Sequence, residues 1–248
     1  MAYTDIDKPS DYFNTKLYVG NGSANHAITG VGFQPDWVWY KGRNDSEDPK
    51  VFDAVRGVTK AIKPNGTDAE FTQSGVTSFN SDGFTLGSHT GGNQNNINFV
   101  SWNWLAANGT ASNTAGSINS TVSVNTTAGF SIVSFDLTSL TGNQTVGHGL
   151  NTAPKVVITK RRSGGAGDWT SYFGAIGNSY LVLNKTTAGA TSSSFMNNTA
   201  PTSSVFTVGD PSWWGADPFI AYCFSEKQGF SKFGSYKGNG SSNGAFIY

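Results

Sequence analysis

The sequence has little of the residues on which several common protein classes depend. It contains one cysteine, Cys223, which excludes disulfide frameworks and cysteine-based zinc sites. Charged residues make up 13% of the chain, about half of the usual share. The 16 basic residues balance the 16 acidic residues, so no basic surplus is available for nucleic acid or an anionic membrane. We therefore expect no nucleic acid among the partners of this chain.

Long apolar runs are also missing. No stretch approaches the roughly 18 apolar residues of a membrane-spanning helix, and the first residues form neither a basic segment nor an apolar run. These absences predict a soluble chain with no signal peptide and no membrane insertion. The composition is instead rich in Ser, Thr, Asn and Gly, which are poor formers of long helices.

What the sequence does contain is an internal repeat with a spacing of about 120 residues. Three pairs of segments follow each other in the same order in both halves: 35–41 with 154–160, 84–87 with 206–209, and 99–104 with 219–224. A further match joins Tyr-Val-Gly-Asn-Gly-Ser at 18–23 to Tyr-Lys-Gly-Asn-Gly-Ser at 236–241. The matches predict an N-terminal arm (1–12), unit 1 (13–109), a Ser/Thr/Asn/Gly connector (110–129), unit 2 (130–229) and an incomplete third repeat (230–248).

Inside each unit the periodicity is that of β-strands. In 99–104, Val100, Trp102 and Trp104 alternate with polar residues, so we expect this face to be core. The copy at 219–224 puts Ile220, Tyr222 and Phe224 on the corresponding face. Asn-Gly and Asp-Gly pairs between such runs favour tight hairpin turns. We predict an all-β fold of two tandem antiparallel β-sandwich units, jelly-roll-like, with a C-terminal hairpin at 230–248. That hairpin either caps a neighbour or supplies missing edge strands to the second sandwich.

Several segments resemble a repeated domain in virion proteins of tailed phages, especially phages of marine bacteria and cyanobacteria. The similarity lies in Asp-Tyr-Phe-Asn-Thr-Lys-Leu-Tyr (11–18), Gly-Phe-Gln-Pro-Asp-Trp-Val-Trp (32–39), Phe-Asp-Ala-Val-Arg-Gly (52–57), Ser-Asp-Gly-Phe-Thr-Leu-Gly (81–87) and Val-Gly-His-Gly-Leu (146–150). The resemblance implies a structural or tail-fibre protein of the virion, assembled in the host cytoplasm. It supplies no catalytic residues.

Catalytic chemistry is weakly indicated, and we expect neither an enzyme nor a cofactor nor a metal site. The chain has three Glu, none with the spacing of a glycosidase pair. Its three His lie in loops without metal-ligand spacing. Four Asp lie beside turns or strand ends, where Asp usually completes a hydrogen-bonded turn. These histidines and aspartates are His26, His89, His148, Asp36, Asp82, Asp210 and Asp217.

The binding candidates are Trp213 and Trp214, in the Pro/Gly loop 210–218. Two adjacent indoles cannot both point into one core, so we expect one to pack inward and the other to contact a partner or ligand. The repeat places the polar loop 88–96 at the same position of unit 1. The aromatic loop fits a subunit interface, packing on its own sandwich, or a platform on which sugar rings stack.

These observations favour a non-enzymatic structural protein of a phage particle, in a tail fibre, an appendage or the capsid decoration, that contributes to host attachment. Its partners would be other virion proteins and further copies of itself, because an aromatic-rich surface of low charge is poorly protected against association. The alternative is a carbohydrate-binding, lectin-like module that recognises a host surface glycan or receptor. A polysaccharide depolymerase ranks last.

Overall fold

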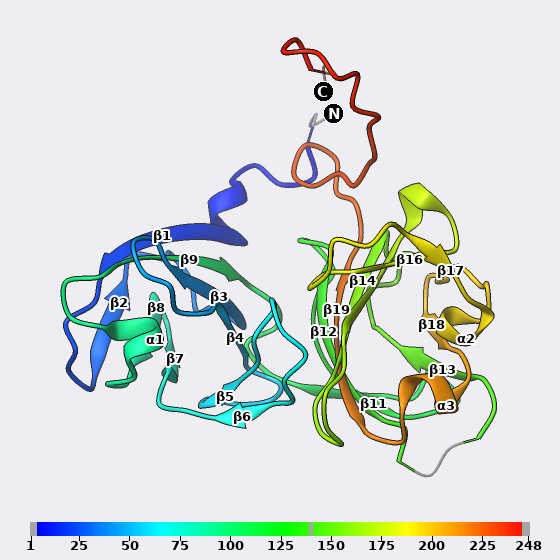
Figure 1. Cartoon of the computed structure of the whole chain (residues 1–248), viewed down its shortest axis with the longest axis horizontal. Coiled ribbons are helices and arrows are strands. Elements are labelled where there is room, and N and C mark those ends of the chain that lie inside the picture. The colour runs from blue at the N-terminus through cyan, green and yellow to red at the C-terminus, as the bar shows by residue number, and fades with distance from the viewer. Residues whose placement is uncertain (1–3, 139–140, 245–248) are drawn as a thin grey trace.

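The computed structural model describes residues 4–138 and 141–244, which form antiparallel β-sheets joined by turns and loops (Figure 1). The all-β sandwich fold predicted from the sequence is confirmed. Within the described ranges, no helix is long and apolar enough to cross a membrane. The helical segments are η1 (Pro9–Asp11), α1 (Thr90–Asn93), η2 (Gly174–Ile176), α2 (Ser193–Met196) and α3 (Pro211–Trp214).

Unit 1 packs a four-stranded sheet, in the order β1-β9-β3-β4, on a three-stranded sheet, in the order β2-β8-β7, with the small pair β5-β6 beside them. Its strands are β1 (Phe13–Val19), β2 (His26–Thr29), β3 (Trp37–Gly42), β4 (Lys50–Asp53), β5 (Lys60–Ala61), β6 (Phe71–Thr72), β7 (Val76–Asn80), β8 (Gly83–Leu86) and β9 (Asn98–Trp104).

Unit 2 packs an eight-stranded sheet, in the order β10-β11-β12-β19-β14-β15-β16-β17, on the pair β13-β18 and on α2 and α3. Its strands are β10 (Ala111–Asn113), β11 (Ser120–Asn125), β12 (Phe130–Asp136), β13 (Gln144–Gly147), β14 (Val156–Arg161), β15 (Trp169–Phe173), β16 (Ser179–Val182), β17 (Ala190–Thr191), β18 (Val205–Val208) and β19 (Pro218–Phe224).

The two units share one strand order, as a repeat requires. In unit 1 the first strand pairs with the last, the last with β3, and β3 with β4; in unit 2 the same connections run through β12, β19, β14 and β15. The strand register also agrees. In each main sheet, the first residue of the first strand pairs with the last residue of the last strand, which pairs in turn with the first residue of the next strand in the sheet. These rows of paired residues are Phe13–Trp104–Trp37 in unit 1 and Phe130–Phe224–Val156 in unit 2.

The expectation of a connector at 110–129 is wrong. This segment contains β10 and β11, and β11 pairs along its whole length with β12, so it extends the main sheet of unit 2. Its composition is that of a linker, but Val122 and Val124 alternate with Thr and Ser, and Val122 is buried in the core of unit 2. A period of two in β-branched residues predicts a strand, whatever the overall polarity.

The hairpin expected at 230–248 is not seen in the described part of that segment. The described residues 230–244 contain no strand, and 245–248 lie outside the described residues. The topology supplies the reason: in both units the first strand pairs with the last strand of the unit, and the described residues 230–244 contain no such strand. Only the turn of the repeat is kept, since Ser23 N donates to Asn21 Oδ1 at 2.9 Å and Ser241 N donates to Asn239 Oδ1 at 3.0 Å.

The residues that the structure describes form three separate cores. One fills the unit 1 sandwich, one fills the unit 2 sandwich, and the third lies between the two main sheets. The face of Trp104 and Tyr222, expected to be the core of each unit, belongs to this third core, where the Trp37 ring stacks on Tyr222 at 4.3 Å and on Phe130 at 5.6 Å. At the junction, these aromatic side chains are therefore buried by the other unit and not by their own sandwich.

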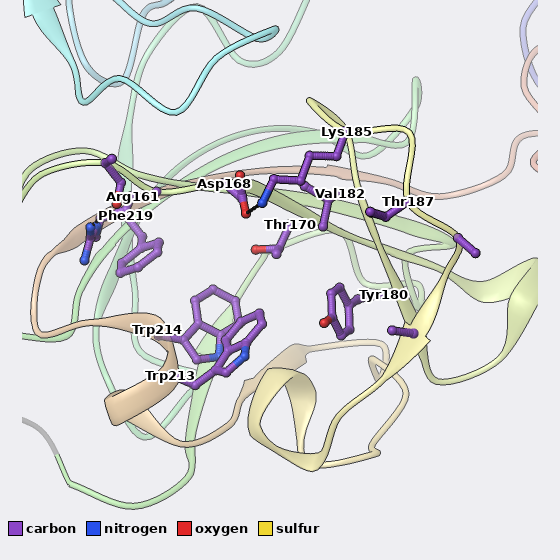
Figure 2. A pocket seen from close by; sticks show the side chains of 14 residues that line it. Arg161, Asp168, Thr170, Tyr180, Val182, Lys185, Thr187, Trp213, Trp214 and Phe219 are labelled. Atoms are coloured by element: carbon purple, nitrogen blue, oxygen red, sulfur yellow. Dashed lines mark hydrogen bonds and ion pairs between the residues drawn. The ribbon is translucent and has the colours of Figure 1, made fainter.

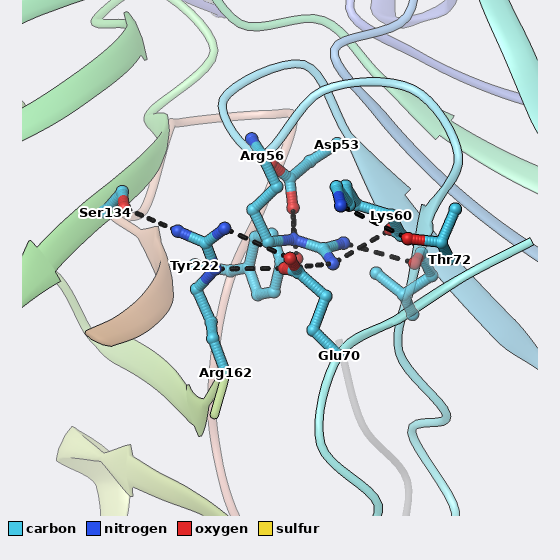
Figure 3. Close-up of polar contacts among 9 residues, drawn as sticks. Asp53, Arg56, Lys60, Glu70, Thr72, Ser134, Arg162 and Tyr222 are labelled. Atoms are coloured by element: carbon cyan, nitrogen blue, oxygen red, sulfur yellow. Dashed lines mark hydrogen bonds and ion pairs between the residues drawn. The ribbon is translucent and has the colours of Figure 1, made fainter. Parts of the chain in front are cut away.

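A polar cluster joins the units beside this aromatic layer (Figure 3). The Arg56 and Asp53 side chains, both fully buried, form an ion pair, and the Tyr222 hydroxyl of unit 2 donates to Asp53 Oδ2 at 2.6 Å. Glu70 then accepts from Arg56 at 3.3 Å and from Arg162 of unit 2 at 2.9 Å. Each buried charge of this cluster thus has an opposite charge within hydrogen-bonding distance.

We predict that Asp53→Asn lowers the free energy of unfolding by about 3 kcal/mol or more, because it leaves the Arg56 guanidinium buried without its principal counter-ion. The matched control is Asp11→Asn, which removes the acid of the exposed Lys8–Asp11 pair and should cost less than about 1 kcal/mol. Urea denaturation of both variants measures the two losses. Equal losses would contradict a special role for the buried cluster.

Lys160 is a second buried cation at this interface. Its side chain is fully buried, and Nζ donates to the carbonyls of Thr67 at 3.0 Å and Gly167 at 2.6 Å. Among the described residues, no carboxylate lies within ion-pair distance of it. Burial in this site, assisted by the nearby Arg161 charge, lowers the pKa of Lys160 to about 8.

We predict that Lys160→Met stabilises the protein more at pH 7 than at pH 9.5. The pKa of Lys160 is lower in the folded chain than in the unfolded chain, so the charged form costs stability below pH 8, and this cost disappears as the pH rises toward the unfolded pKa. The difference between the two pH values should be about 2 kcal/mol. Urea denaturation of variant and wild type at both pH values measures it; a pH-independent difference would show that Lys160 titrates normally.

Candidate functional site

The short helix α3 holds the two tryptophans at one end of the unit 2 sandwich. Asp210 precedes it, and its side chain accepts a hydrogen bond from Ser212 N at 2.8 Å while its carbonyl accepts from Trp213 N and Trp214 N. Gly215 follows with a φ of 94°, a conformation that favours glycine. The turn residues around the pair therefore fix the direction of both indoles.

Trp214 packs inward. Only 4% of it is exposed, and its ring lies parallel to that of Phe195, with centroids 5.5 Å apart. Its Nε1 donates to the carbonyls of Phe195, at 2.8 Å, and Ser194, at 3.1 Å. The indole thereby ties α3 to α2 and supports the neighbouring residue.

Trp213 is turned outward and remains 38% exposed. One side of its ring is held edge-on by Tyr180 at 5.7 Å and by Phe195 at 5.6 Å. One indole in and one indole out is the arrangement expected for this pair. Contact of the outer indole with a partner or ligand stays a prediction.

Both indoles line a cleft of about 500 Å³ in unit 2 (Figure 2). The cleft lies between α3 and the inner face of β14, β15 and β16, where this sandwich opens to solvent. Aromatic side chains form one wall, and polar or charged side chains come from the strands and the loop that follows β16. The lining includes Trp213, Trp214, Tyr180, Thr170, Arg161, Asp168 and Lys185.

The charges of the cleft are arranged as ion pairs. Lys185 Nζ donates to Asp168, which also accepts from Asn184 at 3.0 Å. Burial opposes ionisation of Asp168, but the hydrogen bonds from Lys185 and Asn184 outweigh it and lower the pKa of this carboxyl. Arg161 pairs with Asp217 at 3.4 Å, and its buried Nε has no hydrogen-bond partner among the described residues. The cleft can therefore offer directed donors at nearly balanced charge.

The sequence did not reveal these polar members. Arg161, Asp168 and Lys185 are separated from α3 by some tens of residues and follow no local spacing. Only the pairing of β14 with β15 and of β15 with β16 brings them to one face. Of the residues that line the cleft, only the adjacent tryptophans could be recognised as binding candidates from the sequence.

Unit 1 carries a different structure at the same scaffold position. There α1 lies between β8 and β9, as α3 lies between β18 and β19. The buried Asn93 side chain of α1 donates to the carbonyls of Gly87 and Ser23 and accepts from Asn21 N. Asn93 thus fastens α1 through polar contacts, as Trp214 fastens α3, and α1 itself contains no aromatic residue.

The other residues considered for chemistry have structural contacts. Asp82 accepts from Gly30 N at 2.9 Å and Gly32 N at 2.7 Å, as a turn aspartate does. His148 is fully buried and accepts from Leu150 N through Nδ1. Cys223 is fully buried, and burial raises the pKa of its thiol, so the reactive thiolate form is disfavoured. Among the residues that the structure describes, no three His, Cys, Asp or Glu side chains are grouped to hold a metal ion.

We predict that the two indoles contribute unequally to stability. Trp214→Ala should lower the free energy of unfolding by about 3 kcal/mol or more, since it empties a buried ring site. Trp213→Ala should cost less than about 1.5 kcal/mol, because more than a third of the ring already faces water. Urea denaturation measures both, and a Trp213→Ala loss as large as that of Trp214→Ala would show that Trp213 is a core residue.

Comparison with known proteins adds a family. The family model described as "Domain of unknown function (DUF7483)" matches residues 8–248, which include both units and the segment after them. No curated protein and no solved structure has a significant match to the chain. Because the match extends over nearly the whole sequence, this chain belongs to the DUF7483 family.

Proposed function

We propose that the chain is a non-enzymatic attachment protein of a phage particle, and that the cleft beside Trp213 binds a saccharide of the host surface. The half-exposed Trp213 ring in a cleft with polar walls is the observation that carries this proposal. Sugar rings present apolar C–H faces that stack on indoles, and hydroxyl groups that need hydrogen-bond partners. An aromatic wall opposite Thr170, Arg161 and Lys185 offers both.

Two properties of the cleft suit a saccharide: the fixed position of the outer indole and the balance of charges. Trp213 is held by Tyr180 and Phe195, so little side-chain freedom would be lost when a sugar stacks on its outer face. The Asp168–Lys185 and Arg161–Asp217 pairs leave little net charge, which favours a neutral or weakly charged ligand. An enzymatic role is less well supported, because a glycosidase needs a protonated carboxyl and the pKa of Asp168 is lowered.

The sequence resemblance described above supports the assignment of this chain to a phage particle. Its partners there would be other virion proteins and further copies of this chain. Mass spectrometry of purified particles of a phage that encodes the chain tests this part of the proposal. The protein should be found in stoichiometric amounts in the particle. Its restriction to the infected-cell lysate would contradict a virion role.

We predict that Trp213→Ala weakens saccharide binding by at least about 30-fold, the usual effect of removing an anchoring aromatic ring. Binding is measured by titration calorimetry against a panel of neutral monosaccharides and of purified surface polysaccharides from candidate host bacteria. The matched control is Tyr236→Ala, which removes an aromatic ring that is 69% exposed and lies outside the cleft.

The control variant should bind like the wild type. If the wild type binds no member of the panel, or if Trp213→Ala and Tyr236→Ala bind equally well, the cleft is not a saccharide site.

A further inference from the structure

The outer face of the main sheet of unit 1 is only partly covered. Its first row, Phe13–Trp104–Trp37, lies at the junction with unit 2, but the next rows extend away from that junction. Leu17 and Val19 of β1 are 58% and 53% exposed. Three neighbours on the same face are partly exposed. We call these five residues the open face: Leu17, Val19, Trp39, Val100 and Trp102.

The same face of unit 2 is closed. The ladder register places Tyr222 where unit 1 has Trp102, and Ile220 where unit 1 has Val100. Both Tyr222 and Ile220 are fully buried, in the core that they share with Trp37 and Ile62 of unit 1. One scaffold face, built from equivalent strands, is thus covered by a β-sandwich unit in one half of the molecule and left open in the other.

Along β9 the open face continues from Val100 and Trp102 to Trp104 of the existing interface, with no polar side chain between them on that side of the strand. A groove of about 380 Å³ lies at the junction of the two main sheets, and Trp39 belongs both to this groove and to the open face. Most of the groove is lined by aromatic or aliphatic side chains, among them Phe13, Trp104, Phe130 and Phe224. The apolar surface therefore runs from the buried layer between the units out to Leu17 and Val19.

The charges beside the open face indicate what kind of partner fits it. Lys41 corresponds to the buried Lys160 of unit 2, but Lys41 has its own carboxylate, since Nζ donates to Asp45 Oδ1 at 3.0 Å. An occupant therefore need not bring an acidic group to neutralise Lys41. An apolar sheet face is sufficient, and the molecule already shows that two such faces of this fold pack together.

We propose that the open face binds the open face of a second copy of this chain, so that two unit 1 sheets pack face to face around a two-fold axis. The same residues would then be buried in both copies, as in an isologous dimer. This inference names the surface for the self-association proposed above and rests on that part of the proposal. It does not depend on saccharide binding, because the Trp213 cleft lies in unit 2, away from this face.

Sedimentation equilibrium of the full chain at about 1 to 100 µM, a range in which dimers of modest affinity are visible, tests the proposal. The wild type should form dimers. Leu17→Glu/Val19→Glu places two like charges per copy in the contact and should weaken dimerisation at least about 30-fold. The matched control is Val58→Glu/Leu183→Glu, which puts the same charges on apolar residues that are 37% and 40% exposed elsewhere, and it should dimerise like the wild type.

Circular dichroism checks that each variant is folded, and Val100→Thr, which keeps a β-branched residue in the strand, provides a second and milder test of the face. A monomeric wild type at the highest concentration overturns the proposal. So does a folded Leu17→Glu/Val19→Glu variant that dimerises normally, or a Val58→Glu/Leu183→Glu variant that does not. Saccharide binding by the Leu17→Glu/Val19→Glu variant should be unchanged. Measuring it distinguishes a failure of the dimerisation proposal from a failure of the saccharide proposal.

Discussion

The stacking of Trp37 on Tyr222 is the contact on which the arrangement of the molecule depends. The two rings belong to the outward faces of two sheets whose inward faces already fill separate sandwich cores. Each sandwich alone would expose aromatic side chains to water, at roughly 25 cal/mol for each Å² of apolar surface. Packing the two sheets on each other removes that cost at the junction, and it makes a third core out of surfaces that neither unit can bury by itself.

Aromatic packing is weakly directional, so the polar contacts around it select one arrangement among many. Asp53 accepts from Arg56 of its own unit and from Tyr222 of the other, and Glu70 pairs with Arg56 and Arg162 across the junction. A shifted or rotated interface would leave these charges buried and unpaired. The network therefore contributes specificity more than net stability, since the desolvation of buried ions offsets much of their attraction.

The sequence predicted the parts of the fold that depend on local pattern. Alternation showed that Trp104 shares a face with Trp102, and the repeat showed that both units would be built alike. It could not show that this face is covered by the other unit, because a period of two says which residues lie together and not what lies above them. The hairpin expected at 230–248 failed for a related reason: the partner of a first strand is set by topology, and here it is the last strand of the unit. In the site, the adjacency of Trp213 and Trp214 was visible, whereas Arg161 and Asp168 reach the cleft only through strand pairing.

The difference between α1 and α3 explains how one scaffold can carry two different surfaces. Both helices close the same end of a sandwich, and each is fastened by one side chain that bonds to nearby carbonyls: Asn93 in unit 1 and Trp214 in unit 2. Because the inward residue already fastens the helix, the neighbouring residue is not needed for that purpose. In unit 2 this freedom leaves Trp213 partly exposed on a supported base, where a ring can be presented to a ligand without weakening the core. The repeat thus preserves the fold through the inward side chain and leaves the outward one open to a new function.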